Sequence, residues 1–129
     1  MSLQGLITIV IAAALTSAAN LFLRAGITAA GGFQPTSLMD TAYRFALLLI
    51  EPKFAVGFVL YFIAALVWFR VIASEPLSIA YPVMVSITFL MVTAGAAILF
   101  GERITVRLLV GLLLVLGGIA LLAFHEKPA

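Results

Sequence analysis

Four long stretches of this 129-residue chain are nearly free of charged side chains. Residues 1–23, 76–101 and 108–124 contain none, and residues 54–72 contain only Arg70. A helix of about 20 apolar residues crosses the roughly 30 Å hydrocarbon core of a bilayer. The pattern therefore predicts four transmembrane helices, at about residues 3–23, 54–72, 76–100 and 106–124.

The connection between the first two expected spans contains the pattern of a shorter helix over residues 38–50. Ser37 and Asp40 have the spacing of a capping box, and Asp40 and Arg44 form an i,i+4 pair on the polar side. Apolar residues recur on the other side. A helix of this length cannot span a bilayer, so we expect it to lie in the plane of the interface.

The remaining connections are short and carry typical helix boundary residues. Ser74 and Glu75 supply capping side chains, and Pro76 follows at about the first position of the next helix. The second and third spans are therefore expected to form an antiparallel hairpin. Gly101 should end the third span, and Thr105 can cap the fourth.

The composition supports a membrane protein and excludes several other classes. Hydrophobic residues make up 65% of the chain and charged residues 9%, which leaves too little polar surface for a water-soluble globule. The first stretch lacks the basic region of a cleavable signal peptide. There is no cysteine, and the single histidine, His125, lies in a polar tail, so neither a metal nor a cofactor site is expected. The net charge of +2 is too small for a nucleic-acid interface.

Basic residues are unevenly divided between the two sides of the expected bundle. The first and third connections hold Arg24, Arg44, Lys53, Arg103 and Arg107, whereas the other side holds Arg70 and Lys127. Because basic loops stay in the cytoplasm, both termini should face the periplasm of a bacterial inner membrane. Acidic residues partly offset the first group, so insertion in both orientations stays open.

Polar or aromatic side chains inside three of the expected spans recur at helical spacing, so each set shares one helix face. A polar side chain in contact with lipid is costly, and such faces are expected to point toward protein or a cavity. The sets are Thr16, Asn20 and Arg24 in the first span, Gly57, Tyr61 and Trp68 in the second, and Ser78, Tyr81 and Thr88 in the third. Three helices around one cavity are therefore predicted.

Simpler roles are available for several of these residues. Trp68 can serve as an interfacial anchor, and Thr16 can bond to its own backbone. Arg24 and Arg70 can extend toward the headgroups at the ends of their helices. Glu75 and Glu102 can act as caps or as ion-pair partners.

The fourth expected span contains no polar side chain at all. Gly111 and Gly118 lie seven residues apart on one face, where the backbone of another helix could approach closely. We therefore expect this helix to pack against another subunit. A unit of four helices is also too small to enclose a substrate path and open it to both sides in turn, so a dimer is predicted.

Three segments of the chain resemble the drug/metabolite transporter superfamily: Glu-Pro-Leu-Ser-Ile-Ala-Tyr-Pro at 75–82, Leu-Phe-Gly-Glu-Arg-Ile-Thr at 99–105, and Gly-Gly-Ile-Ala at 117–120. The length and four spans are similar to its small-multidrug-resistance-like branch. The Ala-Tyr-Pro segment, Ser-Ala-Ala-Asn at 17–20 and the long first loop most resemble the paired subunits of the aminoarabinose-phosphoundecaprenol flippase.

The departures from the drug-exporting members of that branch are informative. Those members carry an acidic residue in the middle of the first helix, where this chain has Thr16. Met84 occupies the position of their tryptophan, and Ser86 and Thr88 replace the glycines that bend their third helix. Tyr81 matches their binding-site tyrosine, and the two glycines of the fourth span match their dimer motif. The resemblance implies the scaffold without proton-coupled cation export.

These observations predict an all-α integral membrane protein of one domain, residues 1–129, with four transmembrane helices, a short interfacial helix in the first loop, and a dimeric working state. The leading hypothesis is a subunit of a flippase for a polyprenyl-phosphate-linked sugar or a similar anionic lipid, not an enzyme, with itself or a paralogue as partner. The candidate substrate-binding residues are Asn20, Arg24, Tyr61, Trp68, Arg70, Tyr81 and Ser86, and the candidate dimer residues are Gly111 and Gly118. The alternatives are a small-molecule exporter of the small multidrug resistance type and a non-transporting accessory subunit of a membrane enzyme.

Overall fold

The computed structural model describes residues 3–123, which form five helices. His125, considered as a metal ligand, and Lys127, counted for the orientation, lie outside the described residues. The helices are α1 (Leu3–Ala29), α2 (Leu38–Ile50), α3 (Pro52–Ser74), α4 (Leu77–Leu99) and α5 (Val106–Ala123).

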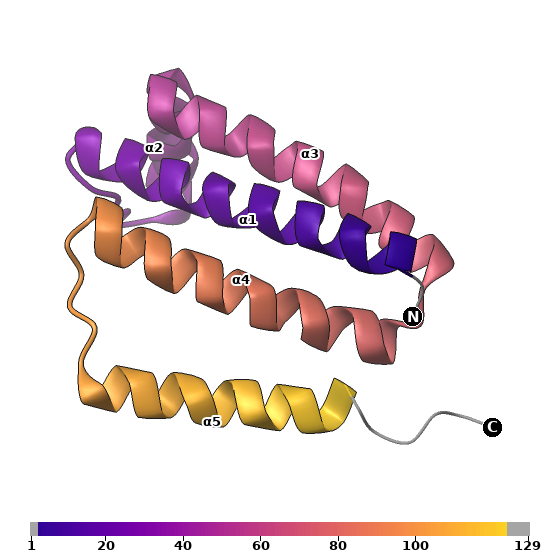
Figure 1. Ribbon diagram of the computed structural model, residues 1–129. Helices are drawn as coiled ribbons and strands as arrows, with labels where there is room; N and C mark the ends of the chain where they lie inside the picture. The colour runs from indigo at the N-terminus through magenta and orange to yellow at the C-terminus, as the bar shows by residue number, and fades with distance from the viewer. Residues whose placement is uncertain (1–2, 124–129) are drawn as a thin grey trace.

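The four longer helices run alternately in opposite directions, and α2 lies behind one end of α1 and α3 (Figure 1). Helix α1 packs against both α3 and α4, α5 packs against α4, and α2 packs against α3. The first turn of α1 and the last turn of α5 lie at the same end of the structure (Figure 1).

Three of the helices, α1, α3 and α4, are long and apolar enough to cross a membrane. The apolar stretch of α5, Val106–Leu121, is shorter. Part of the fold class is therefore confirmed, namely a helical protein with several apolar spans. The fourth span and the dimer stay predictions.

The first helix extends beyond residue 23, where the sequence predicted its end. Helix α1 continues to Ala29, so Arg24 lies inside the helix and not at its end. Arginine is a good helix former, and one charge does not stop a helix. The helix ends where Gly31 adopts a left-handed φ of 91°. There the Gly32 N–H donates to the Ile27 carbonyl at 2.8 Å, as in a Schellman motif.

The predicted boundaries of α2 match the structure, but its capping differs in one bond. The Asp40 N–H donates to the Ser37 Oγ at 3.1 Å, as expected. The Asp40 carboxylate, however, accepts the N–H of Thr36 rather than that of Ser37, and also the Arg44 Nε at 2.9 Å. The Thr36 amide, followed by Arg44, lowers the pKa of Asp40 below its usual value.

The remaining boundaries were predicted to within two residues. Pro52 stands in the first turn of α3, and Pro76 is the residue before α4 rather than the first residue in it. Gly101, with φ of 65°, follows the end of α4. The Thr105 Oγ1 accepts the N–H of Leu108 at 3.1 Å, which confirms it as the cap of α5.

Small residues allow α1 and α3 to approach closely. A Cβ added at Gly57 would lie 2.8 Å from the Leu23 N and 2.9 Å from the Ala19 O, so only glycine fits there. A Cβ added at Gly26 would lie even closer to backbone, at the Phe54 N. Residues 106–121 of α5, by contrast, are all half-buried or exposed. The closely packed core therefore consists of α1, α3 and α4.

Candidate functional site

A groove of about 400 Å³ lies between α1, α3 and α4. Its lining residues carry no charge, and four of them are aromatic. We call it the aromatic groove; it is lined by Thr16, Asn20, Tyr61, Ala64, Ala65, Trp68, Tyr81, Met84, Val85, Thr88 and Phe89.

Two of the aromatic residues, on different helices, contact each other edge to face at the groove. The ring centroids of Trp68 on α3 and Tyr81 on α4 are 6.0 Å apart, with an angle of 65° between the ring planes. Tyr61 lies about two turns before Trp68 on α3 and is 46% exposed. The groove thus has aromatic walls on two helices and an open side.

Two polar side chains of the aromatic groove, Asn20 and Thr88, donate hydrogen bonds to their own helices. The Asn20 amide donates to the Thr16 carbonyl at 3.0 Å, and the Thr88 hydroxyl donates to the Met84 carbonyl at 2.8 Å. The Asn20 carbonyl oxygen and the Thr88 oxygen keep lone pairs for a bound molecule. These two groups are therefore suited to accept hydrogen bonds from hydroxyl or amino groups.

Four of the seven predicted binding residues, Asn20, Tyr61, Trp68 and Tyr81, come together in this groove. Ser86 does not line it. Its hydroxyl donates to the Pro82 carbonyl at 2.8 Å, a common arrangement for serine inside a helix. Met84 and Thr88, which were noted for their departures from the transporter pattern, do line the groove.

Arg24 belongs to a neighbouring pocket rather than to the groove. This Arg24 pocket has a volume of about 270 Å³ and is lined by Asn20, Leu21, Arg24, Val92, Ala96, Phe100 and Glu102. The Arg24 NH1 is 3.7 Å from the Glu102 Oε2, and the guanidinium lies 5.7 Å from the centroid of the Phe100 ring. The role of Glu102 as an ion-pair partner is thus confirmed. Because Asn20 lines both spaces, the pocket adjoins the groove.

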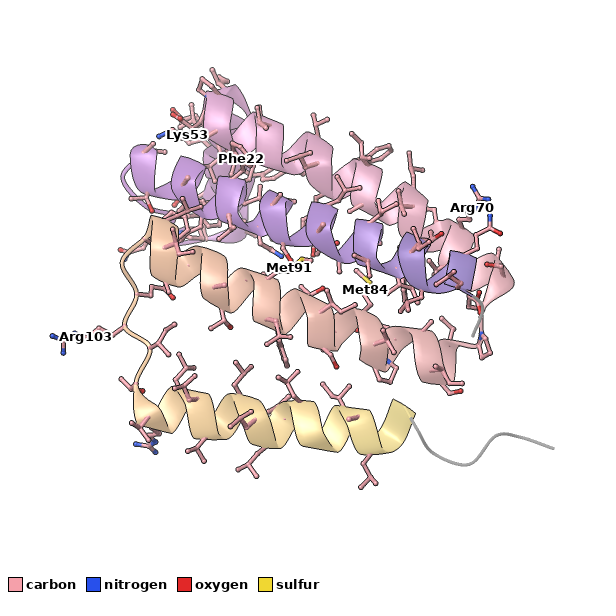
Figure 2. All side chains as sticks on the ribbon, viewed as in Figure 1. Phe22, Lys53, Arg70, Met84, Met91 and Arg103 are labelled. Carbon is pink, nitrogen blue, oxygen red and sulfur yellow. The ribbon has the colours of Figure 1, made fainter. Side chains whose placement is uncertain are left out.

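Arg70 lies at the other end of the structure, away from Lys53 and Arg103 (Figure 2). It lines a small pocket of about 210 Å³, together with Gln4, Gly5, Thr8, Ser74 and Glu75. The Glu75 side chain packs directly on Gly5 of α1. The two predicted arginines therefore lie at opposite ends, and neither lines the aromatic groove.

A second hollow adjoins the aromatic groove on the side of α2. It has a volume of about 420 Å³, and we call it the apolar hollow; its lining is Leu23, Phe45, Phe54, Phe58, Tyr61, Phe62 and Ala65. Phe45 of α2 contacts Phe54 and Phe58 of α3, with ring centroids 6.2 and 5.9 Å apart. Tyr61 and Ala65 border both spaces. Residue spacing did not predict this hollow, because Phe45 and the other phenylalanines lie on two separate helices.

The two predicted dimer glycines lie on an open part of α5. A Cβ added at Gly111 or Gly118 would meet no atom within 4 Å, and the same holds for Gly117. Gly111 also borders a shallow depression between α4 and α5, beside Phe89 and Thr93. A single subunit therefore leaves this strip free for contact with another helix.

Comparison with known families gives a match over most of the chain. A sequence profile described as "Putative transmembrane family 234" matches residues 9–123. No solved structure matches the chain.

Curated relatives match a part of the chain. Proteins of Yersinia pestis (strain Pestoides F) and Yersinia pseudotuberculosis (serotype O:1b) are each 40% identical to it over 60 residues, which is 46% of this chain and 52% of theirs. A protein of Erwinia tasmaniensis is 37% identical over 62 residues, 48% of this chain and 56% of its own. All three are named "Probable 4-amino-4-deoxy-L-arabinose-phosphoundecaprenol flippase subunit ArnE". The chain spans about half the length of the curated relatives it matches.

Proposed function

The chain belongs to the family described as "Putative transmembrane family 234", and on that premise we propose that it is one subunit of a flippase for a polyprenyl-phosphate-linked sugar or a similar anionic lipid. The partial similarity to proteins named as flippase subunits supports a transporter-like role. Those relatives are transport subunits and not enzymes by name. In this proposal the chain binds and moves its substrate without covalent chemistry.

The observation that carries the proposal is the chemistry of the aromatic groove. Trp68 and Tyr81 offer ring faces of the kind that pack against the C–H surfaces of a sugar, and Asn20 and Thr88 offer acceptors for its hydroxyl groups. An amino group on the sugar would also be favoured by the aromatic faces. A groove with these properties fits a polar but uncharged or cationic head group.

The phosphate is assigned to Arg24, in the pocket that adjoins the groove at Asn20. A guanidinium binds phosphate oxygens with two parallel charge-assisted bonds. A charge at the centre of a bilayer costs roughly 2.5 to 3.5 kcal/mol by insertion scales, so a nearby cation would ease the entry of an anion. Arg70 is proposed to receive the phosphate at the opposite end.

The apolar hollow offers an apolar surface to a part of the polyprenyl tail beyond the phosphate. It adjoins the aromatic groove at Tyr61 and Ala65, and every residue that lines it is apolar or aromatic. The rest of the tail would stay in the bilayer, so the protein needs to shelter only the head group and the phosphate.

Assembly and topology are parts of the same proposal. We assign α5 as the fourth span of a protein in the bacterial inner membrane, with both termini outside the cytoplasm and the fold of the small-multidrug-resistance-like branch. The open strip at Gly111 and Gly118 supports contact with a second subunit, either a copy of this chain or a paralogue. A second subunit would also close the open side of the groove.

The rival function, export of small cations in exchange for protons, requires a carboxyl group within the binding site. None of the described residues that line the aromatic groove is acidic. Thr16, at the position of the missing acid, faces the groove and cannot take up a proton in the physiological pH range. The groove therefore favours a lipid-linked head group over a proton-coupled cation.

Proteoliposomes containing the purified chain, alone and with a candidate paralogue, test the proposal. The measurement is the transfer of a fluorescent polyprenyl-phosphate sugar from the inner to the outer leaflet. We expect faster transfer than in protein-free liposomes, and slower transfer when Trp68 is replaced by alanine. Transfer that equals the protein-free rate with either preparation would reject the proposed function. Normal transfer after substitution of groove residues, given an active partner, would identify the chain as an accessory subunit.

A further inference from the structure

Arg24 is held by a group that a substrate phosphate would have to replace. The Glu102 carboxylate approaches the guanidinium at the mouth of the Arg24 pocket, with 3.7 Å between NH1 and Oε2. A strong charge-assisted bond between such groups measures about 2.7 to 2.9 Å. The side chains of Arg24 and Glu102 are 61% and 49% exposed, so solvent weakens the pair further. The contact is loose and open to competition.

The two contacts of Arg24 differ in what a phosphate would do to them. Phe100 lies at the guanidinium with its ring centroid 5.7 Å from the carbon, and this contact leaves the N–H groups available. Glu102 carries a negative charge and approaches one nitrogen of the guanidinium at 3.7 Å, beyond hydrogen-bond distance. A phosphate that bound Arg24 would repel Glu102 and would leave the Phe100 contact in place.

The Glu102 side chain can move away while its backbone stays attached to the end of α4, where the Glu102 N–H donates to the Ala96 carbonyl at 3.4 Å. Residues 101–105 form no helix, and Gly101 before it has a left-handed φ of 65° with no atom within 4 Å of an added Cβ. Helix α4 ends before this segment, at Leu99. Glu102 can therefore leave Arg24 without disturbing the helix that carries Tyr81.

We propose that Glu102 is a built-in competitor for the substrate phosphate at Arg24, and that its displacement releases the connection between α4 and α5 from α1. This inference rests on the proposed function, because it requires a phosphate-bearing substrate. Glu102 is a positioning residue: it lies beside the guanidinium while the pocket is empty, and an anion must bind Arg24 more tightly than this loose contact does in order to displace it. A phosphate ester that binds with two parallel bonds makes closer contacts than the single 3.7 Å approach of Glu102.

Binding measurements on the whole protein in nanodiscs test this role. The probes are a polyprenyl phosphate and the uncharged polyprenol of the same length. We expect Glu102→Gln to strengthen phosphate binding about two- to fivefold, the range that an exposed ion pair allows, and to leave polyprenol binding unchanged. In the background of Arg24→Gln the same substitution should have no effect, since the two residues act together.

A matched control is available at the same end of the structure. Glu51, between α2 and α3, has no side-chain capping bond, and Glu51→Gln removes an equal charge. If Glu51→Gln strengthens binding as much as Glu102→Gln does, the effect is general electrostatics and the inference is wrong. The inference is also wrong if phosphate binding depends on Arg24 but is unchanged or weaker in Glu102→Gln. If the wild type binds the phosphate no better than the polyprenol, the proposed function itself fails.

A distance measurement tests the release directly. The chain contains no cysteine, so spin labels can be attached at Thr28→Cys in α1 and Ile104→Cys in the connection without background. We expect the distance between the labels to increase when polyprenyl phosphate is added to protein with Glu102, and to be already increased in Glu102→Gln. An unchanged distance in a sample that binds the phosphate would overturn the proposed release.

Discussion

Trp68 of α3 and Tyr81 of α4 contact each other edge to face, with their ring centroids 6.0 Å apart and their planes at 65°. The two residues lie 13 positions apart in sequence and meet close to the tight turn at Ser74, Glu75 and Pro76, before α4 continues along α1. In the proposed function this pair holds the sugar. Substitutions of this pair and of other residues should change the rate of transport or the stability of the protein.

The first prediction concerns this pair. Trp68→Ala should slow translocation of the lipid-linked sugar about tenfold, because a ring face that packs on the head group is lost, and Trp68→Phe should restore most of the rate. Phe69→Ala is the matched control, since Phe69 is 58% exposed and does not line the groove. Equal rates for Trp68→Ala and Phe69→Ala would remove the tryptophan from the binding site and leave it as an anchor.

The second prediction concerns the two arginines at opposite ends of the structure. Arg24→Lys and Arg70→Lys should each slow translocation about tenfold, because lysine keeps the charge but cannot bind a phosphate with two parallel bonds. Arg44→Lys, in the exposed pair with Asp40, should be silent. Full activity of both lysine variants and of the double variant would show that these arginines only position the helix ends.

Much of this site could be predicted from the sequence, because helical spacing fixes which side chains share a face. Asn20, Tyr61, Trp68 and Tyr81 all reach the groove for that reason. Arg24 does not, although it continues the series of every fourth residue from Thr16. Four residues turn a helix by about 400°, so each step drifts about 40°, and two steps carry Arg24 out of the groove toward Phe100.

Other features of the site depend on contacts between helices, and the spacing of residues along the sequence does not predict them. Ser86 lies about 140° around α4 from Tyr81, and its hydroxyl is bonded to the Pro82 carbonyl. The apolar hollow forms only because α2 folds back so that Phe45 meets Phe54 and Phe58. The sequence placed these phenylalanines on two helices but did not indicate how those helices would meet.

The third prediction concerns the assembly. Replacing Gly111 and Gly118 with leucine should separate the subunits, because these glycines form the open strip of α5. A Cβ at either position meets no atom within 4 Å, so the leucines should not disturb the subunit itself. Gly117→Leu is equally open and points elsewhere, which makes it the control. Cross-linking in membranes that detects as much dimer in the double variant as in the control would place the interface elsewhere.

The fourth prediction concerns the contact between α1 and α3. Gly57→Leu should destabilise the protein by about 1 to 3 kcal/mol or more, because the added side chain must displace the backbone of Ala19 or Leu23. Thermal unfolding in detergent measures the effect. Gly111→Leu should leave the unfolding of a monomeric preparation unchanged. Equal unfolding temperatures for the two variants would contradict the close packing of these helices.

The fifth prediction concerns the energy source. Liposomes with the wild-type chain should not accumulate a quaternary ammonium cation when a pH gradient is imposed, since the groove contains no carboxyl group among its described lining residues. Cation uptake that follows the gradient and stops when the gradient is collapsed would favour the exporter function over the flippase.

The most direct test of the central claim is to locate the head group itself. A polyprenyl-phosphate sugar with a photoreactive group on the sugar is cross-linked to the active protein in membranes, and the adducts are mapped by mass spectrometry. We predict adducts on α3 and α4 around Trp68 and Tyr81, which disappear when an excess of unlabelled lipid-linked sugar is added. Adducts confined to the outer surface of α5, or insensitive to that competitor, would contradict the assignment of the aromatic groove as the binding site.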